Sequence, residues 1–352
     1  MKIDFKQVYV QEKIYENAHW KTNADGILAR FPDARVTRVD NHWRLPELTR
    51  RDPADWMQSK RDYLVLGVRG SFKQAVNGRS ADYIAASISN GCLSSCQYCY
   101  VARRKGGSNP LTLFVNDDQI IAAIRRHQAR LGTRTEPNQT DSHLWTYDIG
   151  CNSDLSLDAM IADLPGKLIE AFADMPHAKA TFATKTVNHD YWLTLDHKGH
   201  TRIRYSLMPQ PVARYVDIGT SKIGDRIASI NALVDGGYEV HVNFSPIILY
   251  GGDQWRRDWV ALWEEMNDVL SERAKAQLKC ELFFLTHSRG LHEVNMQWNP
   301  KGEAFLWSEE LRPKPSKPDV LAYDWRIRRS ELERFQNGLR KYLPYCDVRY
   351  AF

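Results

Sequence analysis

The sequence predicts an α/β protein whose centre is a partial (β/α)6 barrel. Six short runs with the composition of buried strands alternate with helical stretches, which is the pattern of parallel βα units. Six units are fewer than the eight that close a barrel. Reactive side chains stand at the carboxyl ends of the first four strands, where a catalytic barrel carries its site. They are a cysteine-rich loop, Cys151, Lys185 and Ser206.

The individual elements follow from composition and from helix boundary signals. The strands are expected at 83–89, 143–149, 179–184, 202–208, 239–245 and 280–285. The helices between them are expected at 116–131, 164–174, 222–234 and 254–274. Asn116, with Gln119 three residues later, resembles a capping box at the start of the first helix. Gly236 and Gly237 mark the end of the third helix.

Two extensions flank the barrel segment, which we place at residues 81–290. Residues 1–80 are rich in arginine with interspersed acidic residues, and they are expected to form an N-terminal α/β extension with a solvated face. Residues 291–352 are expected to form a C-terminal helix-strand extension on the substrate side. There, the Pro/Lys-rich residues 312–318 predict a connector, followed by a helix at 330–342 and a strand at 347–350.

Composition sets limits on the class of protein. A chain of 352 residues with 43% hydrophobic and 26% charged residues can bury a sizeable globular core. The sequence contains no apolar run of membrane-spanning length and no apolar signal region at its start, so no membrane partner is expected. Free thiols favour the reducing cytoplasm. The net charge of +5 suits an anionic partner without requiring one, and the oligomeric state stays open.

The most informative motif is Cys92-x3-Cys96-x2-Cys99. Three thiolates at this spacing fit three corners of an iron–sulfur cube and leave the fourth iron open to chelate a small molecule. Tyr98, just before the third cysteine, strengthens this interpretation. Structural zinc prefers four ligands in paired C-x2-C knuckles, and a disulfide framework needs a short, cysteine-dense secreted chain. The iron–sulfur interpretation is therefore favoured, and zinc remains the alternative.

The triplet resembles the signature of the radical S-adenosylmethionine (SAM) superfamily, and the longer pattern resembles the spore photoproduct lyase family. The resemblance covers about residues 60–285 and the C-terminal end. The family-like segments are GCNSD (150–154), FATK (182–185), RIRYS (202–206), GTSKIGDRI (219–227) and DVRYAF (347–352). It implies that the partial barrel is of the radical-SAM type, with a [4Fe-4S] cluster and SAM as cofactors.

The resemblance also implies a role for nine residues. The cluster ligands would be Cys92, Cys96 and Cys99; the SAM-binding residues Lys185, Ser153 and Ser206; the hydrogen-atom donor Cys151; and the relay residues Tyr98 and Tyr100. These residue types suit the roles. A weak S–H bond readily gives a hydrogen atom to a carbon radical, and a lysine ammonium suits the SAM carboxylate as a point charge.

The implied activity is that of a carbon–carbon lyase in DNA repair. A 5′-deoxyadenosyl radical would take the C6 hydrogen of a thymine–thymine photoproduct, the methylene bridge would break by β-scission, and Cys151 would quench the thymine radical. A lesion inside a duplex would have to be extruded. A low-potential donor of the flavodoxin or ferredoxin type would supply the electron.

Less specific interpretations stay open. Cys151 could be a small buried hydrophobe, the two tyrosines could only pack, and Lys185 could face solvent. Residues 103–105, Arg-Arg-Lys, could contact phosphates or simply be solvated. Asp154 could cap the turn that follows it.

The chain also departs from the family pattern. Met208 stands where the family shows a polar residue near SAM, and residues 286–325 match the repair enzymes poorly. Two other functions therefore remain candidates. One is a sibling radical SAM lyase, isomerase or modifying enzyme acting on another nucleobase or a small metabolite. The other is a zinc-stabilised nucleic-acid-binding protein that is not an enzyme.

Overall fold

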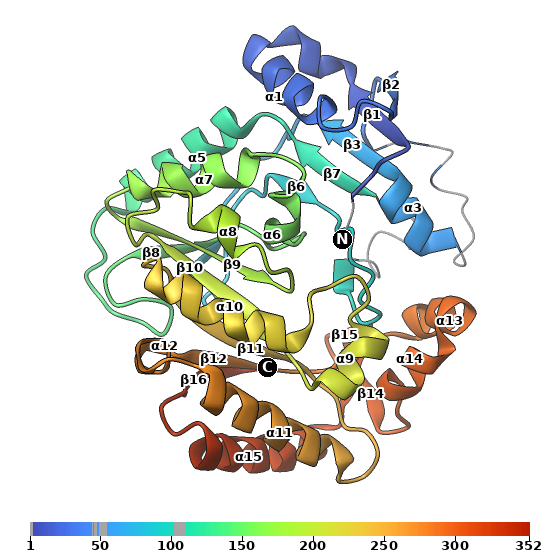
Figure 1. Ribbon diagram of the computed structural model, residues 1–352, viewed down its shortest axis with the longest axis vertical. Helices are drawn as coiled ribbons and strands as arrows, with labels where there is room; N and C mark the ends of the chain where they lie inside the picture. The colour runs from blue at the N-terminus through green and yellow to red at the C-terminus, as the bar shows by residue number, and fades with distance from the viewer. Residues whose placement is uncertain (1–2, 44, 46–47, 49–54, 102–109) are drawn as a thin grey trace. The chain divides into compact units, whose positions relative to one another are not determined.

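Figure 1 shows the protein as a computed structural model, which describes residues 3–43, 45, 48, 55–101 and 110–352. The candidate phosphate contacts at residues 103–105 lie outside the described residues. The chain forms two compact units. The first comprises Met1–Leu93 and Arg104–Ile203, and the second comprises Ser94–Arg103 and Arg204–Phe352. The expected three-part division at residues 80 and 290 stays a prediction.

The first unit contains a five-stranded sheet that includes the expected N-terminal α/β extension. Its order is β2-β1-β3-β7-β6, and every neighbouring pair except β6 with β7 is parallel. The strands are β1 (Gln7–Gln11), β2 (Arg35–Val39), β3 (Tyr63–Gly67), β6 (Ser89–Asn90) and β7 (Leu111–Phe114). The helical elements near it are η1 (Glu12–Glu16), α1 (Ala18–Leu28) and α3 (Trp56–Asp62).

The first unit also contributes the first barrel strands, in the order β4-β5-β8-β9-β10. They are β4 (Ala75–Val76), β5 (Tyr83–Ile84), β8 (Trp145–Asp148), β9 (Ala178–Thr184) and β10 (Thr201–Leu207), which runs into the second unit. The helices are α5 (Asp117–Leu131), α6 (Leu155–Asp158), α7 (Leu164–Ala173) and α8 (His189–Trp192); α5 and α7 lie side by side (Figure 1).

Two local predictions in the first unit are wrong. The strand expected at 83–89 is split, because only Tyr83 and Ile84 pair with β8, whereas Ser89 pairs with β7 in the other sheet. The small residues between them have weak β-propensity, which allows the chain to change sheets there. The capping box is also absent. The Asn116 side chain instead accepts a hydrogen bond from the Arg69 N–H (2.8 Å) and donates one to the Arg69 carbonyl (3.0 Å).

The second unit continues the barrel in the order β10-β11-β12-β16. Its strands are β11 (Glu239–Ile247), β12 (Lys279–Phe284) and β16 (Asp347–Ala351), and a small sheet is formed by β13 (Thr286–His287), β14 (Leu311–Lys314) and β15 (Lys317–Tyr323). Its helices are α9 (Gln210–Val216), α10 (Ile223–Asp235), α11 (Gln254–Val269), α12 (Glu272–Gln277), α13 (Arg289–Trp298), α14 (Pro300–Leu306) and α15 (Trp325–Tyr342). The alternation confirms the predicted partial α/β barrel and its C-terminal helix-strand extension.

Helix ends in the second unit follow from single residues. The helix α10 ends as expected, because Gly237 adopts a left-handed backbone with φ of 86°. The helix expected at 254–274 is two helices, because Leu270 is extended and Ser271 caps α12 by accepting the Ala274 N–H (3.2 Å). The last helix begins at Trp325, earlier than expected, because Asp324 accepts the Arg326 N–H (2.9 Å).

The expected connector at 312–318 is wrong as well, since these residues belong to a hairpin. The antiparallel strands β14 and β15 pair Pro313 with Leu321, and the turn between them is at 315–316. Residues 312 and 313 are exposed on a sheet of three strands, where a proline's missing N–H costs little. The proline content therefore marked an edge strand rather than a linker.

The C-terminal extension is fixed to the second unit by packing and by buried charge. Gly338 on α15 allows the Trp263 ring of α11 to approach closely, because a Cβ there would lie 2.6 Å from a ring carbon. In the sheet, buried Glu281 accepts hydrogen bonds from Arg204 (3.2 Å), Arg349 (2.6 Å) and Tyr350 (2.9 Å). Removing one partner of such a buried set costs about 3–5 kcal/mol. These contacts bind β16 to the edge of the barrel.

No helix in the described part of the chain has the length and apolar character that crossing a bilayer requires.

Candidate active site

In the first unit, the loop after β8 carries Cys151. Gly150 N–H donates to Asp148 Oδ1 (3.1 Å), and the Gly91 N–H donates to the Asn152 carbonyl (3.0 Å). Gly91 immediately precedes Cys92, so this backbone hydrogen bond brings the loops of Cys92 and Cys151 side by side. Both cysteines are partly exposed, which is what access to a substrate requires. Cys151 is therefore not simply a buried core residue.

A buried hydroxyl–carboxyl cluster lies in the same loop system. The hydroxyls of Ser89 and Ser153 are 2.5 Å apart, and each contacts Asp158 Oδ2, at 2.5 and 2.6 Å. Burial raises the pKa of Asp158 to about 7, and the two serine hydrogen bonds oppose part of that rise. Asp158 therefore holds the Ser153 side chain in place and itself titrates near neutral pH.

Asp154 connects this loop to the end of β9. Its carboxylate accepts the Lys185 N–H (2.8 Å) and the Thr184 hydroxyl (2.6 Å). It also accepts the Leu157 N–H (3.3 Å), which confirms the predicted cap of α6. One buried carboxylate thus joins the segments that carry Ser153 and Lys185, two of the candidate SAM-binding residues. The Lys185 side chain is partly exposed.

In the second unit, the rest of the cysteine loop is held by backbone hydrogen bonds. Ser95 N–H donates to the Ile218 carbonyl (2.8 Å), and Gln97 N–H donates to the Val216 carbonyl (3.0 Å). Cys99 N–H donates to the Cys96 carbonyl (3.1 Å), which closes a tight turn between two of the candidate ligands. Cys96 is 8% exposed and Cys99 is more exposed.

Tyr98 and Ser206 both contact the same buried ion pair, which Asp217 and Arg226 form. The Tyr98 hydroxyl donates to Asp217, which is paired with the Arg226 guanidinium at 3.2 Å. Burial, together with the Asp217 charge, raises the pKa of Tyr98 well above its ordinary value. Arg226 also donates to the Ser206 carbonyl (2.7 Å). The phenol therefore stays protonated and oriented, whereas Tyr100 is 36% exposed.

The same loop is supported by α13 and α14. Asn295 donates to the Gln97 carbonyl (2.9 Å). The Gln97 side chain donates to the Asn299 carbonyl (2.9 Å) and accepts from the Asn299 amide (3.1 Å). Gln97 is fully buried and lies between Cys96 and Cys99 in the sequence, so these three hydrogen bonds add to the backbone hydrogen bonds that hold the loop.

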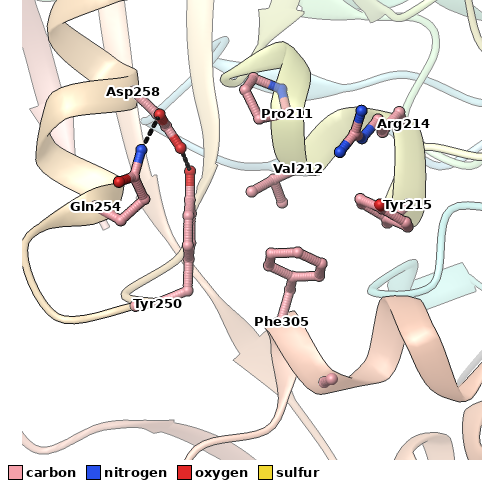
Figure 2. Close-up of a pocket in the computed structure, with 10 residues that line it drawn as sticks. Pro211, Val212, Arg214, Tyr215, Tyr250, Gln254, Asp258 and Phe305 are labelled. Atoms are coloured by element: carbon pink, nitrogen blue, oxygen red, sulfur yellow. Dashed lines mark hydrogen bonds between the residues drawn. The ribbon is translucent and has the colours of Figure 1, made fainter.

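Helix α9, which meets the cysteine loop at Val216, also lines an aromatic pocket of about 460 Å³ (Figure 2). Phe305 stacks on Tyr215 with ring centres 5.2 Å apart, and Arg214 lies over the Tyr215 ring. Across the pocket, the Tyr250 hydroxyl donates to Asp258 (2.6 Å). Burial, followed by the Asp258 hydrogen bond, raises the pKa of Tyr250. Aromatic faces beside a guanidinium suit a nucleobase and a phosphate.

The donor set fits an iron–sulfur cluster better than structural zinc. All six cysteines lie in the described residues, as reduced thiols. Cys280 and Cys346 are buried, and the pKa of Cys280 is raised through its hydrogen bond to Cys346 and its burial. These two thiols contact each other, and the candidate cluster ligands are the three thiols of the triplet. Three thiols match a cube with one open iron, whereas structural zinc needs four ligands.

Comparisons with known proteins agree with this geometry. A sequence model described as spore photoproduct lyase matches residues 6–351. The chain is 25% identical over 290 residues to the spore photoproduct lyase of Geobacillus sp. (strain Y412MC61), covering 82% of this chain and 81% of the relative. It is 22% identical over 320 residues to the spore photoproduct lyase of Bacillus subtilis (strain 168), covering 90% of this chain and 89% of the relative.

Solved structures show the same fold. A double mutant of spore photoproduct lyase with bound AdoMet and dinucleoside spore photoproduct superposes with a TM-score of 0.87 at 21% identity, covering 100% of both chains. Spore photoproduct lyase complexed with dinucleoside spore photoproduct superposes with a TM-score of 0.86, also at 21% identity and covering 100% of both chains. The chain therefore shares the partial-barrel fold of these structures.

Sequence reasoning missed the residues that support the site. Asp158, Asp217, Arg226 and Asn299 contact candidate residues or the backbone that carries them, but no motif named their roles. Arg226 lies inside the segment GTSKIGDRI, which was the only signal available. The other three are ordinary polar residues, and each has a partner distant in sequence: Ser89 for Asp158, Tyr98 for Asp217 and Gln97 for Asn299.

Proposed function

The chain belongs to the spore photoproduct lyase family, and from this premise we propose that it is a radical SAM lyase that cleaves a thymine–thymine photoproduct in DNA. One observation supports the proposal most strongly. Asp154 joins the segments of Ser153 and Lys185, and the loop that also carries Cys151 is hydrogen-bonded to the segment of Cys92. A partly exposed thiol beside a cluster ligand suits hydrogen-atom donation to a carbon radical.

The proposed cofactors are a [4Fe-4S] cluster and SAM. Cys92, Cys96 and Cys99 would hold the cluster, and a set of three side chains would hold SAM: Lys185, Ser153 and Ser206. When bound, these cofactors supply a 5′-deoxyadenosyl radical that removes the C6 hydrogen of the lesion. The Lys185 ammonium can pair with a carboxylate as a point charge, and the Ser153 hydroxyl is held by Asp158.

Cys151 is the proposed hydrogen-atom donor. When the methylene bridge has broken, the thymine left with an unpaired electron on its former bridge carbon takes the hydrogen atom of the Cys151 S–H bond. A C–H bond forms, an S–H bond breaks, and the sulfur keeps one unpaired electron. Tyr98 and Tyr100 are the proposed relay residues; the Tyr98 phenol is kept protonated beside Asp217.

The proposed substrate is a nucleotide lesion. Two solved relatives are described with dinucleoside spore photoproduct bound, and this chain carries a net charge of +5. Within a duplex the lesion would have to be flipped out. A flavodoxin- or ferredoxin-type donor would supply the electron, and a cluster with free thiols suits the cytoplasm.

The direct test uses anaerobically reconstituted full-length enzyme with SAM, dithionite and dinucleoside photoproduct. We expect release of repaired thymine nucleoside. Cys151→Ala should lose normal turnover, and the matched control Cys346→Ser, which changes a buried thiol elsewhere, should keep it. Failure of the wild-type enzyme on dinucleoside and oligonucleotide substrates alike would reject the proposal.

A sibling radical SAM activity on another nucleobase or small metabolite is the second candidate. It is favoured by the expectation from the sequence that residues 286–325 depart from the family, since α13 and α14 in this segment support the cysteine loop. Stoichiometric consumption of SAM with Cys151→Ala fully active would favour this second function. Iron and sulfide analysis separates both enzymes from the zinc-stabilised nucleic-acid-binding alternative.

A further inference from the structure

A cluster of two histidines and a glutamate lies in the small subdomain formed by residues 286–307. His287 comes from β13, His292 from α13 and Glu303 from α14. One potential ligand atom from each of the three lies within 4.8 Å of the other two. His287 Nε2 is 2.7 Å and His292 Nδ1 is 2.6 Å from the same oxygen, Glu303 Oε1. Three different elements thus converge on one point.

The cluster is enclosed on most sides. The side chains of His287 and Glu303 are 0% and 1% exposed, whereas that of His292 is 26% exposed. The Trp307 ring stacks on the His292 ring with centres 3.9 Å apart and meets His287 edge-on. The imidazole planes are therefore fixed, and the site is reached from solvent only on the His292 side.

A further residue orients the carboxylate. Asn295 donates to Glu303 Oε2 at 2.6 Å, which leaves Oε1 facing the two imidazoles. Hydrogen bonds of this kind, from outside the ligand set, orient metal ligands in proteins. The Asn295 amide also donates to the Gln97 carbonyl in the cysteine loop. A rigid cluster would therefore stiffen the support of that loop.

We propose that His287, His292 and Glu303 bind a divalent transition-metal ion, separate from the cluster at the cysteine triplet. Two imidazoles and one carboxylate form a ligand set used for Zn²⁺ in catalytic sites and, with open positions, for Fe²⁺. The exposed side of His292 leaves room for water as a further ligand. The ion would join β13, α13 and α14, and through Asn295 it would steady Gln97. This inference does not rest on the proposed lyase activity.

A competing explanation uses the same distances. Both imidazoles could donate N–H groups to an ionised Glu303, which would then be held by hydrogen bonds alone. The two explanations differ in metal content. They also differ in the ligand types that an X-ray absorption spectrum at the zinc edge would report.

The test loads the cluster-reconstituted full-length enzyme with a slight excess of Zn²⁺, removes unbound metal by gel filtration, and counts zinc separately from iron. We expect about one zinc per chain with only nitrogen and oxygen ligands at about 2.0–2.1 Å. Glu303→Gln and His292→Asn should each lose the zinc while keeping the iron. Asn295→Ala should weaken zinc binding about 10- to 100-fold. Circular dichroism checks that each variant is folded, and His292→Asn is the least disruptive because His292 is the most exposed ligand.

A matched control comes from the first unit. His19, Asp117 and Asp118 also offer three ligand atoms within 4.8 Å, but they include a single imidazole, and His19 and Asp118 are exposed. His19→Asn should leave the zinc count unchanged. The proposal is overturned if wild-type protein retains no zinc, if the zinc has sulfur ligands at about 2.3 Å, or if Glu303→Gln binds as wild type.

Discussion

The two compact units fix their catalytic loops by different chemistry. In the first unit, two buried carboxylates do so: Asp154 holds the Lys185 segment, and Asp158 holds Ser153. In the second unit, neutral amides hold the cysteine loop, through Gln97, Asn295 and Asn299. Asp154 lies in the family-like segment GCNSD, whereas Asn295 and Asn299 come from residues 286–325, which we expected from the sequence to match the repair enzymes poorly, although the family model spans them. The candidate residues are therefore supported by buried carboxylates in the first unit and by neutral amides in the second.

The largest expected effect is the loss of bound iron when a cysteine of either unit is replaced. Cys92→Ala in the first unit and Cys96→Ala in the second should each abolish cluster assembly, because we propose both as ligands of the same cube. The iron bound per chain after reconstitution should fall from about four to near zero, and repair should be lost. Iron and sulfide analysis measures this. Full iron content in either variant would remove that cysteine from the ligand set.

The next effect concerns the buried carboxyl of the first unit. The folded-state pKa of Asp158 is about 7, above its ordinary value of 3.8, so folding takes up a proton between these two pH values. The free energy of unfolding should therefore decrease as pH rises through this window and level off above about pH 7. Between pH 5 and 7 the free energy of unfolding of the wild type should fall by about 2–3 kcal/mol more than that of Asp158→Asn.

Urea unfolding of both proteins at several pH values measures that difference, with Asp190→Asn, at a highly exposed carboxylate, as the control. A difference that does not change with pH would show that Asp158 is not held protonated by burial.

A smaller effect compares the two kinds of support directly. Asp154→Ala leaves the Lys185 N–H and the Thr184 hydroxyl without their acceptor, which should cost about 1–3 kcal/mol and weaken SAM binding. Asn299→Ala removes the side-chain hydrogen bonds to Gln97 Oε1 (3.1 Å) and to the Tyr215 carbonyl (3.0 Å), and it should cost about 1–2 kcal/mol. It should release iron faster under a chelator, with SAM binding to the loaded enzyme nearly unchanged. Calorimetry measures SAM binding, and a chelator assay measures the rate of iron release. If both variants changed SAM binding and iron release in the same way, the proposed difference between the units would be contradicted.

The smallest effect is expected at the aromatic pocket. Phe305→Leu removes the ring that stacks on Tyr215 but keeps much of the apolar volume. If the pocket contacts a nucleobase next to the lesion, KM for an oligonucleotide should rise several-fold, since stacking contributes about 1–3 kcal/mol per base. The dinucleoside should be affected less. Equal effects on both substrates would place the pocket outside the nucleotide path.

The sequence predicted the barrel and most of its elements well, because alternating strand and helix patterns are local signals. The strand ends at residues 149 and 184 correctly located the Cys151 and Lys185 loops. It failed where a residue has two possible uses: Pro313 lies in an edge strand rather than a connector, and Asn116 contacts Arg69 rather than capping a helix. Asp158 and Asn299 could not be predicted, because no motif marks them and each has a distant partner: Ser89 lies 69 residues from Asp158, and Gln97 lies 202 residues from Asn299.

The central claim is that the Cys151 thiol gives its hydrogen atom to the product. An S–H hydrogen exchanges with solvent, so turnover in D₂O should place deuterium in the methyl group of the released thymine. Cys151→Ala should lose this transfer, and Cys346→Ser should retain it. Repair by the wild-type enzyme in D₂O without deuterium in that methyl group would contradict the account.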